Sequence, residues 1–281
     1  MKLNNLKASV FNSRTLFSVS FIVFLIFIGI ILNIRLKTLL VRFVEGQVAR
    51  QAATIAEKAS ETLMTEITNL QYRANSLEQN ADIIEYIFPA MQEGNSEMKI
   101  GLLDTDGSYV IGENFSPADF PVIRSSFRGK GTISYNKDYG LMFSCPVYHG
   151  DNIRYVMCEL CPNDAINDFF SVSCFDGMGK ALVISQNDSM IIPFNNMSED
   201  DVDFFFGNEI ASYYPELMDD LSRSVSTARN VVTSEGDYYI FMADMPDTDF
   251  FTAGFVDAGT AAEGADSIVL LVRRVFILIT I

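Results

Sequence analysis

The hydrophobic pattern of the chain begins with an uncharged apolar run from Thr15 to Ile34, which lies between Arg14 and Arg35. The run contains twenty residues, and a helix needs about 20 apolar residues to cross the hydrocarbon core of a bilayer. We therefore expect a transmembrane helix over 15–34. A cleaved signal peptide is the alternative, but it has an apolar region of about 7–15 residues and a small-residue cleavage site, which the sequence around Asn33 lacks.

From Leu36 to about Met91 the apolar residues recur every three or four positions, with one step of five. This spacing draws a single stripe along a helix, and no proline interrupts it before Pro89. We therefore expect a long stalk helix over 35–93. So narrow a stripe predicts that the helix packs along a sheet domain or pairs with a second copy of itself. The stripe consists of Leu39, Phe43, Val48, Ala52, Ile55, Ala59, Leu63, Ile67, Leu70, Ala74 and Leu77.

After residue 96 the apolar period changes from helical spacing to two, which is typical of β-strands. The pattern predicts strands at 99–103, 108–112, 131–136, 141–148 and 153–161. A similar order follows, with strands at 181–185 and 189–192, helical segments over 199–229, and strands at 231–234, 238–245 and 250–257. We therefore expect an α+β chain with two antiparallel-sheet modules, at 94–175 and 176–265, which repeat one strand order.

The end of the chain becomes apolar again from Ser267 to Ile281, with Arg273 and Arg274 inside the stretch. We expect residues 266–281 to be the start of a second transmembrane helix that the sequence truncates, so that the chain is a fragment of a two-span protein. The two arginines would then lie at the membrane interface, where long cationic side chains reach the headgroups. A C-terminal amphipathic helix lying on the domain is the alternative.

Charge indicates the orientation and the partners. No acidic residue occurs before Glu45, so the formal net charge of −16 belongs to the part of the chain beyond the apolar run. We expect residues 1–14 to be a cytoplasmic tail and the acidic domain to lie outside the inner membrane. An acidic domain is a poor partner for nucleic acid or for an anionic membrane surface, and neither is expected to bind it.

Two stretches resemble the double Cache family, the extracytoplasmic sensor modules of bacterial transmembrane receptors. The stretch over 145–170 is similar to the family's paired strands and following helix, although Cys158-Glu159-Leu160 stands where the family has valine-aspartate-isoleucine. The stretch over 236–256 resembles its closing hairpin, with Phe250 or Phe251 where the family often has tryptophan. The resemblance implies a transmembrane helix, a stalk helix, two PAS-like modules and a second span. The Tyr, Arg and Trp cluster of the amino-acid-binding members is not found here.

The resemblance makes Glu159 the first candidate for ligand contact, because binding members use an aspartate there to meet a cationic group. Alternation along the strand puts Tyr155 on the same face, and Ser144 belongs to the neighbouring strand. An ion pair between Glu159 and a nearby arginine, such as Arg128 or Arg154, is the alternative. The further ligand candidates are Arg128, Tyr135 and Tyr139, which lie in or before the third strand and its turn.

The four cysteines are expected to be buried free thiols. Cys158 and Cys161 form a C-x-x-C, but on a strand their Cα atoms would be about 10 Å apart, which prevents a disulfide. A hairpin centred on Gly150 places Cys145 opposite Val156, which also argues against a bond to Cys158. The remaining cysteine is Cys174. The sequence has a single histidine and no second C-x-x-C, which argues against a four-ligand zinc site, so no metal is expected.

No catalytic constellation is found. The one histidine, His149, rules out most Ser-His and Cys-His arrangements, and the sequence has no Gly-rich phosphate loop. We expect a non-enzymatic stretch without a cofactor: the small-molecule sensing region of a signal-transduction receptor whose output domain, such as a diguanylate cyclase or a histidine kinase, follows C-terminally. A surface-anchored adhesion protein and an anchored hydrolase are the alternatives.

Assembly follows from the lower end of the helical stripe. Leu39 and Phe43 lie closer to the expected membrane segment than any sheet that could cover them. Exposure of such side chains to water costs about 1.5–3 kcal/mol each. We therefore expect a parallel homodimer, with packing of the C-terminal helix from about Asp266 within one chain as the alternative.

Overall fold

The computed structural model describes residues 2–79, 84–93, 98–186 and 190–263. The expected second membrane segment at 266–281 lies outside the described residues. Within these ranges, no helix is both long enough and apolar enough to cross a membrane. Residues 47–261 form one compact unit that contains both sheets.

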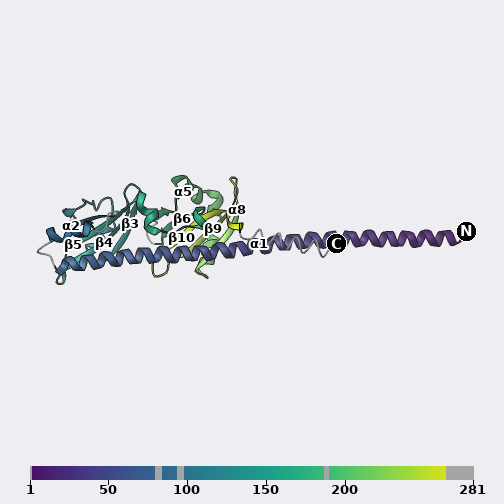
Figure 1. Cartoon of the computed structure of the whole chain (residues 1–281), viewed down its shortest axis with the longest axis horizontal. Coiled ribbons are helices and arrows are strands. Elements are labelled where there is room, and N and C mark those ends of the chain that lie inside the picture. The colour runs from purple at the N-terminus through teal and green to yellow at the C-terminus, as the bar shows by residue number, and fades with distance from the viewer. Residues whose placement is uncertain (1, 80–83, 94–97, 187–189, 264–281) are drawn as a thin grey trace. The chain divides into compact units, whose positions relative to one another are not determined.

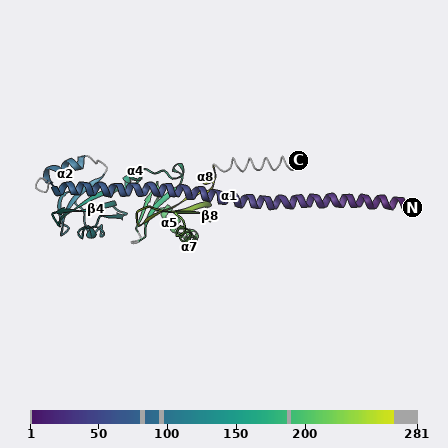
Figure 2. The same cartoon turned by 90° about the horizontal axis from the view of Figure 1, so that it is seen from below.

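The helical stripe is confirmed as the buried face of α1 (Lys2–Gln79). Beyond residue 47 the helix lies alongside both sheets in both views of the chain (Figures 1 and 2). Ile67 is only partly buried, and Leu39 and Phe43 are exposed by 63% and 44%. The stripe residues that are fully or almost fully buried are Val48, Ala52, Ile55, Ala59, Leu63, Leu70, Ala74 and Leu77.

The spacing predicted one stalk helix to residue 93, whereas the described residues in this range form two helices, with α1 ending at Gln79. A separate helix, α2 (Ile84–Glu93), contacts strand β2 (Tyr109–Gly112) of the first sheet. The buried Phe88 ring lies so close to Gly112 that a Cβ there would approach it to 2.4 Å. The apolar residues of α2 therefore cover the edge of the first sheet.

The two predicted modules are present, and their repeat is confirmed by strand order. The first sheet has the order β2-β1-β5-β4-β3 and the second has β7-β6-β10-β9-β8, so both follow the pattern 2-1-5-4-3. The first sheet consists of β1 (Lys99–Asp104), β2, β3 (Thr132–Asn136), β4 (Gly140–His149) and β5 (Asn152–Pro162). The second consists of β6 (Lys180–Ser185), β7 (Ile191–Phe194), β8 (Ser226–Val232), β9 (Asp237–Asp244) and β10 (Phe250–Asp257).

The boundary between helix and strand in the second module differs from the prediction. The helical segments end with α7 (Tyr214–Leu221), so the helix predicted to Arg229 is too long. The strand predicted at 231–234 is present as β8, but it begins earlier, at Ser226, and ends at Val232. Arg229 lies within β8 and forms ion pairs with Glu216 and Asp220 of α7. Its charge therefore joins a strand to a helix. Strand β7 is likewise two residues later than predicted.

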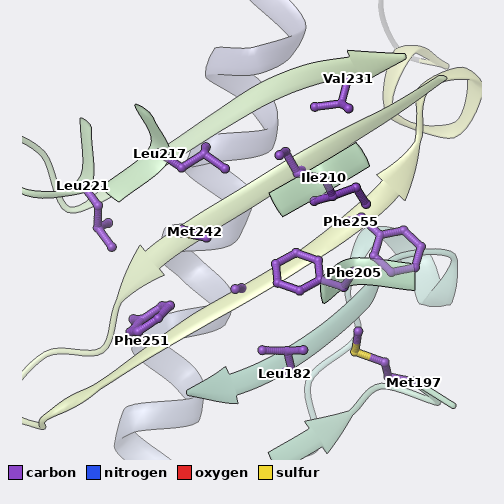
Figure 3. Packing of buried hydrophobic residues seen from close by; sticks show 12 residues of the cluster. Leu182, Met197, Phe205, Ile210, Leu217, Leu221, Val231, Met242, Phe251 and Phe255 are labelled. Atoms are coloured by element: carbon purple, nitrogen blue, oxygen red, sulfur yellow. The ribbon is translucent and has the colours of Figure 1, made fainter. Parts of the chain in front are cut away.

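Each sheet has one face toward α1 and one face covered by other segments. In the second module α5 (Glu199–Phe206), α6 (Asn208–Ala211) and α7 cover the face away from α1, where Figure 3 shows Phe205, Ile210 and Leu217 over the strands. In the first module, the segment from 113 to 130, with α3 (Ile123–Ser126), packs on Leu103, Met142 and Val156. The remaining helices are α4 (Ile166–Phe170) and α8 (Ala258–Ala262).

Candidate functional site

The six predicted ligand residues are divided between different surfaces of the first module. In the register of β4 and β5, Phe143 pairs with Glu159 and Ser144 pairs with Cys158, so Glu159 and Ser144 face opposite sides of the sheet. Tyr155 shares the side of Glu159, which is the α1 side. The other three lie elsewhere: Arg128 and Tyr139 are exposed in turns, and Tyr135 is half-buried on the edge strand β3.

On the α1 side, the completely buried Glu159 carboxylate is paired with Arg73 of α1. The guanidinium makes a two-pronged contact, with Nη1 at 3.0 Å from Oε1 and Nη2 at 2.5 Å from Oε2. The same Nη2 is 2.6 Å from Oε1 of Glu66, one further carboxylate of α1. The ion-pair alternative is therefore present, but its partner is neither Arg128 nor Arg154.

Two carboxylates share one guanidinium in this cluster, and this arrangement affects protonation. Burial raises the pKa of Glu159 from its ordinary value of 4.5 to about 7, while the Arg73 charge lowers it and the Glu66 charge adds to the rise. Since Arg73 can balance only one negative charge, a proton on the more deeply buried carboxyl removes the excess. The cluster thus links β5 to α1 through an ion pair that depends on the protonation state of Glu159.

On the opposite side of the sheet, Ser144 belongs to a cluster of three hydroxyl groups. Its Oγ lies 2.8 Å from Ser126 Oγ and 2.6 Å from Thr132 Oγ1, and those two are 3.2 Å apart. Ser126 and Ser144 are fully buried. Together the three hydroxyls join α3, β3 and β4 by hydrogen bonds.

The aromatic rings of α4 connect the two modules. Phe143 of β4 lies 5.6 Å from Phe169 between ring centroids, Phe169 lies 5.2 Å from Phe170, and Phe170 lies 4.8 Å from Phe194 of β7. Phe143 is also the residue opposite Glu159 in the sheet. The rings of Phe143, Phe169, Phe170 and Phe194 thus form one continuous series of contacts from β4 of the first sheet to β7 of the second.

The four cysteines are free and buried, as expected. The structure pairs Cys145 with Met157, not with Val156, because the register shifts between Val147 and Tyr148. Cys145 and Cys158 consequently point to opposite faces of the sheet. Burial raises the pKa of Cys145 and of Cys174 to about 12 and raises that of Cys158 as well, which favours the protonated thiol over the nucleophilic thiolate. Among the described residues, no group of His, Cys, Asp and Glu side chains could hold a metal ion.

The sequence analysis missed Arg73, Glu66, Ser126 and Thr132 as members of these clusters. A signal for the first two was available, because Glu66 and Arg73 are two helical turns apart and border the apolar stripe at Leu70. The hydroxyl cluster has no comparable signal, since single serines and threonines are common in strands and turns.

No protein-family model and no curated protein matches the sequence, so the similarity to known proteins is one of structure. The extracellular domain of soHK1S-Z6, titled a histidine kinase, aligns with a TM-score of 0.53 and 10% identity, over 78% of this chain and 96% of that one. The ligand-binding domain of the Pseudomonas aeruginosa PAO1 chemoreceptor PctB, in complex with L-Arg, aligns with a TM-score of 0.50 and 15% identity. The alignment covers 75% of this chain and 94% of that one.

A third similar structure is the ligand-binding domain of the Pseudomonas fluorescens chemoreceptor CtaA in complex with L-leucine. It has a TM-score of 0.51 and 14% identity, and the alignment covers 79% of this chain and 96% of that one. All three are sensor or ligand-binding domains with which this chain shares its long helix and paired sheets over most of its length. The chain therefore has the fold of these extracellular sensor and ligand-binding domains, in agreement with the resemblance to the double Cache family.

Proposed function

We propose that the chain is the extracytoplasmic sensing region of a membrane-bound signal-transduction receptor, and that it binds a small molecule in its first module. The observation that carries the proposal is the two-pronged ion pair between Glu159 and Arg73, in a double Cache fold. It ties the sheet of the first module to a helix that also contains the apolar segment over 15–34.

The membrane anchor and the output belong to this proposal and are supported by the sequence. The uncharged run over 15–34 has the length of a membrane span, and residues 266–281 have the composition of the start of another. We propose that the first module is distal to the membrane and the second is proximal, with an output domain C-terminal to the second span. Dimerisation is supported by the exposure of Leu39 and Phe43 on α1.

The proposed ligand site uses Ser144 and its hydroxyl neighbours together with the exposed Arg128 and Tyr139. Because Ser126 and Ser144 are fully buried, a ligand would have to displace the covering segment over 113–130 to reach them. Tyr139 already lies over the Phe120 ring of the covering segment, at 5.8 Å between centroids. Contact of Glu159 with a cationic ligand stays a prediction, and such a ligand would have to replace the Arg73 guanidinium. In either arrangement, a ligand that repositions β4 or β5 would change the geometry of the Glu159–Arg73 ion pair, and through it the position of α1.

A thermal-shift screen of the full chain in detergent, against amino acids, organic acids, sugars and amines, tests the proposal. A ligand at 100 times its dissociation constant should stabilise the fold by about 2.7 kcal/mol. Ser144→Ala should reduce this response, while Ser173→Ala, an exposed serine outside the cluster, should not. Absence of any stabilising compound, together with binding to a host macromolecule, would favour the adhesion alternative.

A further inference from the structure

A cavity of about 530 Å³ lies where the two modules meet. The first module contributes Tyr135 and Ile166 to its wall, and the second contributes Phe194, Met197 and two residues of α5, Glu199 and Asp203. Its volume falls within the range of about 300–1,000 Å³ that small-molecule sites occupy. It is separate from the Ser144 face and from the Glu159 cluster.

Contacts between the modules hold this cavity in shape. Asn167 of α4 donates from Nδ2 to Asn196 Oδ1 at 3.2 Å, and the Asn196 backbone N–H donates to Asn167 Oδ1 at 3.0 Å. The Phe170 and Phe194 rings pack beside them. Ile166, Phe194 and Met197 are buried, so the floor of the cavity is apolar and supported from both sides.

The rim of the cavity is acidic. Glu199 and Asp203 are four residues apart on α5, so both carboxylates project from one face of the helix. No hydrogen bond or ion pair within the described chain engages either side chain, whereas Asp201 on the same helix caps its N-terminus and pairs with Lys180. Lys137 also lines the cavity, which leaves two carboxylates against one ammonium.

Tyr135 supplies a polar group between the acidic rim and the apolar floor. Burial raises the pKa of its phenol, and the charge of Glu199 raises it further, so the hydroxyl lies within the field of that carboxylate. A neutral phenol oxygen can accept a hydrogen bond from a cation held by the carboxylates. Apolar walls with a few converging acceptors suit a compound that is cationic at one end and apolar at the other.

We propose that this cavity is a second binding site, specific for small organic amines with an apolar body. The ammonium group would be held by Glu199 and Asp203 with Tyr135, and the apolar body would lie on Phe194 and Met197. The site goes beyond the proposed function, because it needs neither the ligand of the first module nor a signalling output. A molecule bound there would contact both modules and favour one arrangement of the two sheets.

Isothermal titration calorimetry of the full chain in detergent micelles tests the site with three probes of similar shape: 2-phenylethylamine, 2-phenylethanol and 3-phenylpropionate. The amine should bind at least about tenfold more tightly than the neutral and anionic probes, a difference of about 1.4 kcal/mol. The double variant Glu199→Gln/Asp203→Asn should lose at least about tenfold in amine affinity. Asp200→Asn is the matched control, since it removes a charge from the same helix outside the cavity.

Equal affinity for the amine and the alcohol would overturn the proposal, as would an unchanged amine affinity in the double variant. Lack of amine binding at millimolar concentration would overturn it as well. Circular dichroism melts confirm that each variant is folded. The amine affinity of Tyr135→Phe, which should also be reduced, is a second measurement on the site that leaves α5 intact. A first-module ligand found in the thermal-shift screen would still bind the double variant, which separates failure of this site from failure of the sensing function.

Discussion

Replacement of Arg73 by glutamine is expected to destabilise the fold strongly. The substitution removes both contacts to Glu159, at 3.0 and 2.5 Å, and the contact to Glu66 at 2.6 Å. Glu159 has no solvent exposure, so its charge would be left buried beside a second carboxylate. Removal of one partner from a buried pair typically costs about 3–5 kcal/mol. Because the carboxyl can take up a proton instead, we expect about 3 kcal/mol at pH 8 and less at pH 5.5.

The pH dependence of the unchanged protein follows from the same cluster. Glu159 titrates at about 7 in the folded chain and near 4.5 when unperturbed, so between these values the folded state binds more protons than the unfolded state. Stability contributed by this group is therefore present below pH 4.5 and is lost as the pH rises toward 7. The slope is at most about 1.4 kcal/mol per pH unit. Glu159→Gln should remove that slope.

Urea unfolding of the full chain, followed by circular dichroism between pH 5 and 8, measures both effects in one experiment. The double variant Arg73→Met/Glu159→Gln is the control, because it removes the fully buried Glu159 charge together with its partner and leaves only the partly exposed Glu66 carboxylate, so it should recover much of the lost stability. A cost below about 1 kcal/mol for Arg73→Gln at pH 8 would equal that of an exposed pair and would refute the reasoning. If the stability of the wild-type chain had the same pH dependence as that of Glu159→Gln, the assigned direction of the Glu159 pKa shift would be refuted.

Four further outcomes are expected. Gly112→Ala should lower the free energy of unfolding by at least about 2 kcal/mol, because the residue has φ of +87° and the new Cβ would meet Phe88 at 2.4 Å. In the same denaturation assay Gly46→Ala should raise it by up to about 1 kcal/mol, because Gly46 lies in a helix with open space around it. Ser198→Ala removes the side-chain cap of α5 and should lower the free energy of unfolding by about 1 kcal/mol. An unchanged free energy of unfolding would contradict the role of the cap. Leu39→Cys, at a position that is 63% exposed on α1, should crosslink between subunits in membranes at low expression. Failure of that crosslink, with crosslinking to the 266–273 region of the same chain instead, would contradict the dimer.

The local periodicities were sufficient to predict most of the architecture. The spacing of three and four identified the buried face of α1 from Val48 to Leu77, because one helix face must meet the sheets. The period of two identified the strands and the opposite orientations of Glu159 and Cys158, since side chains alternate along any strand. The repeated strand order also followed from local patterns and turns.

The contacts between distant segments could not be predicted in this way. Arg73 and Glu159 are separated by 86 residues, and their pairing depends on how α1 is placed against β5. A one-residue irregularity at Val147 changed the partner of Cys145, which no periodicity encodes. The cavity at Tyr135 required the packing of two modules, whose facing side chains are far apart in the sequence.

Hydrogen exchange of the full chain, with and without a compound identified in the thermal-shift screen, tests the central claim most directly. The account predicts that the compound slows exchange in β4 and β5 of the first sheet and also changes exchange in α1 around Glu66 and Arg73. The change in α1 should disappear in the Arg73→Met/Glu159→Gln variant, although the compound still binds. Slowed exchange limited to the binding surface, with α1 unchanged in the wild-type chain, would contradict a sensor that signals through this helix.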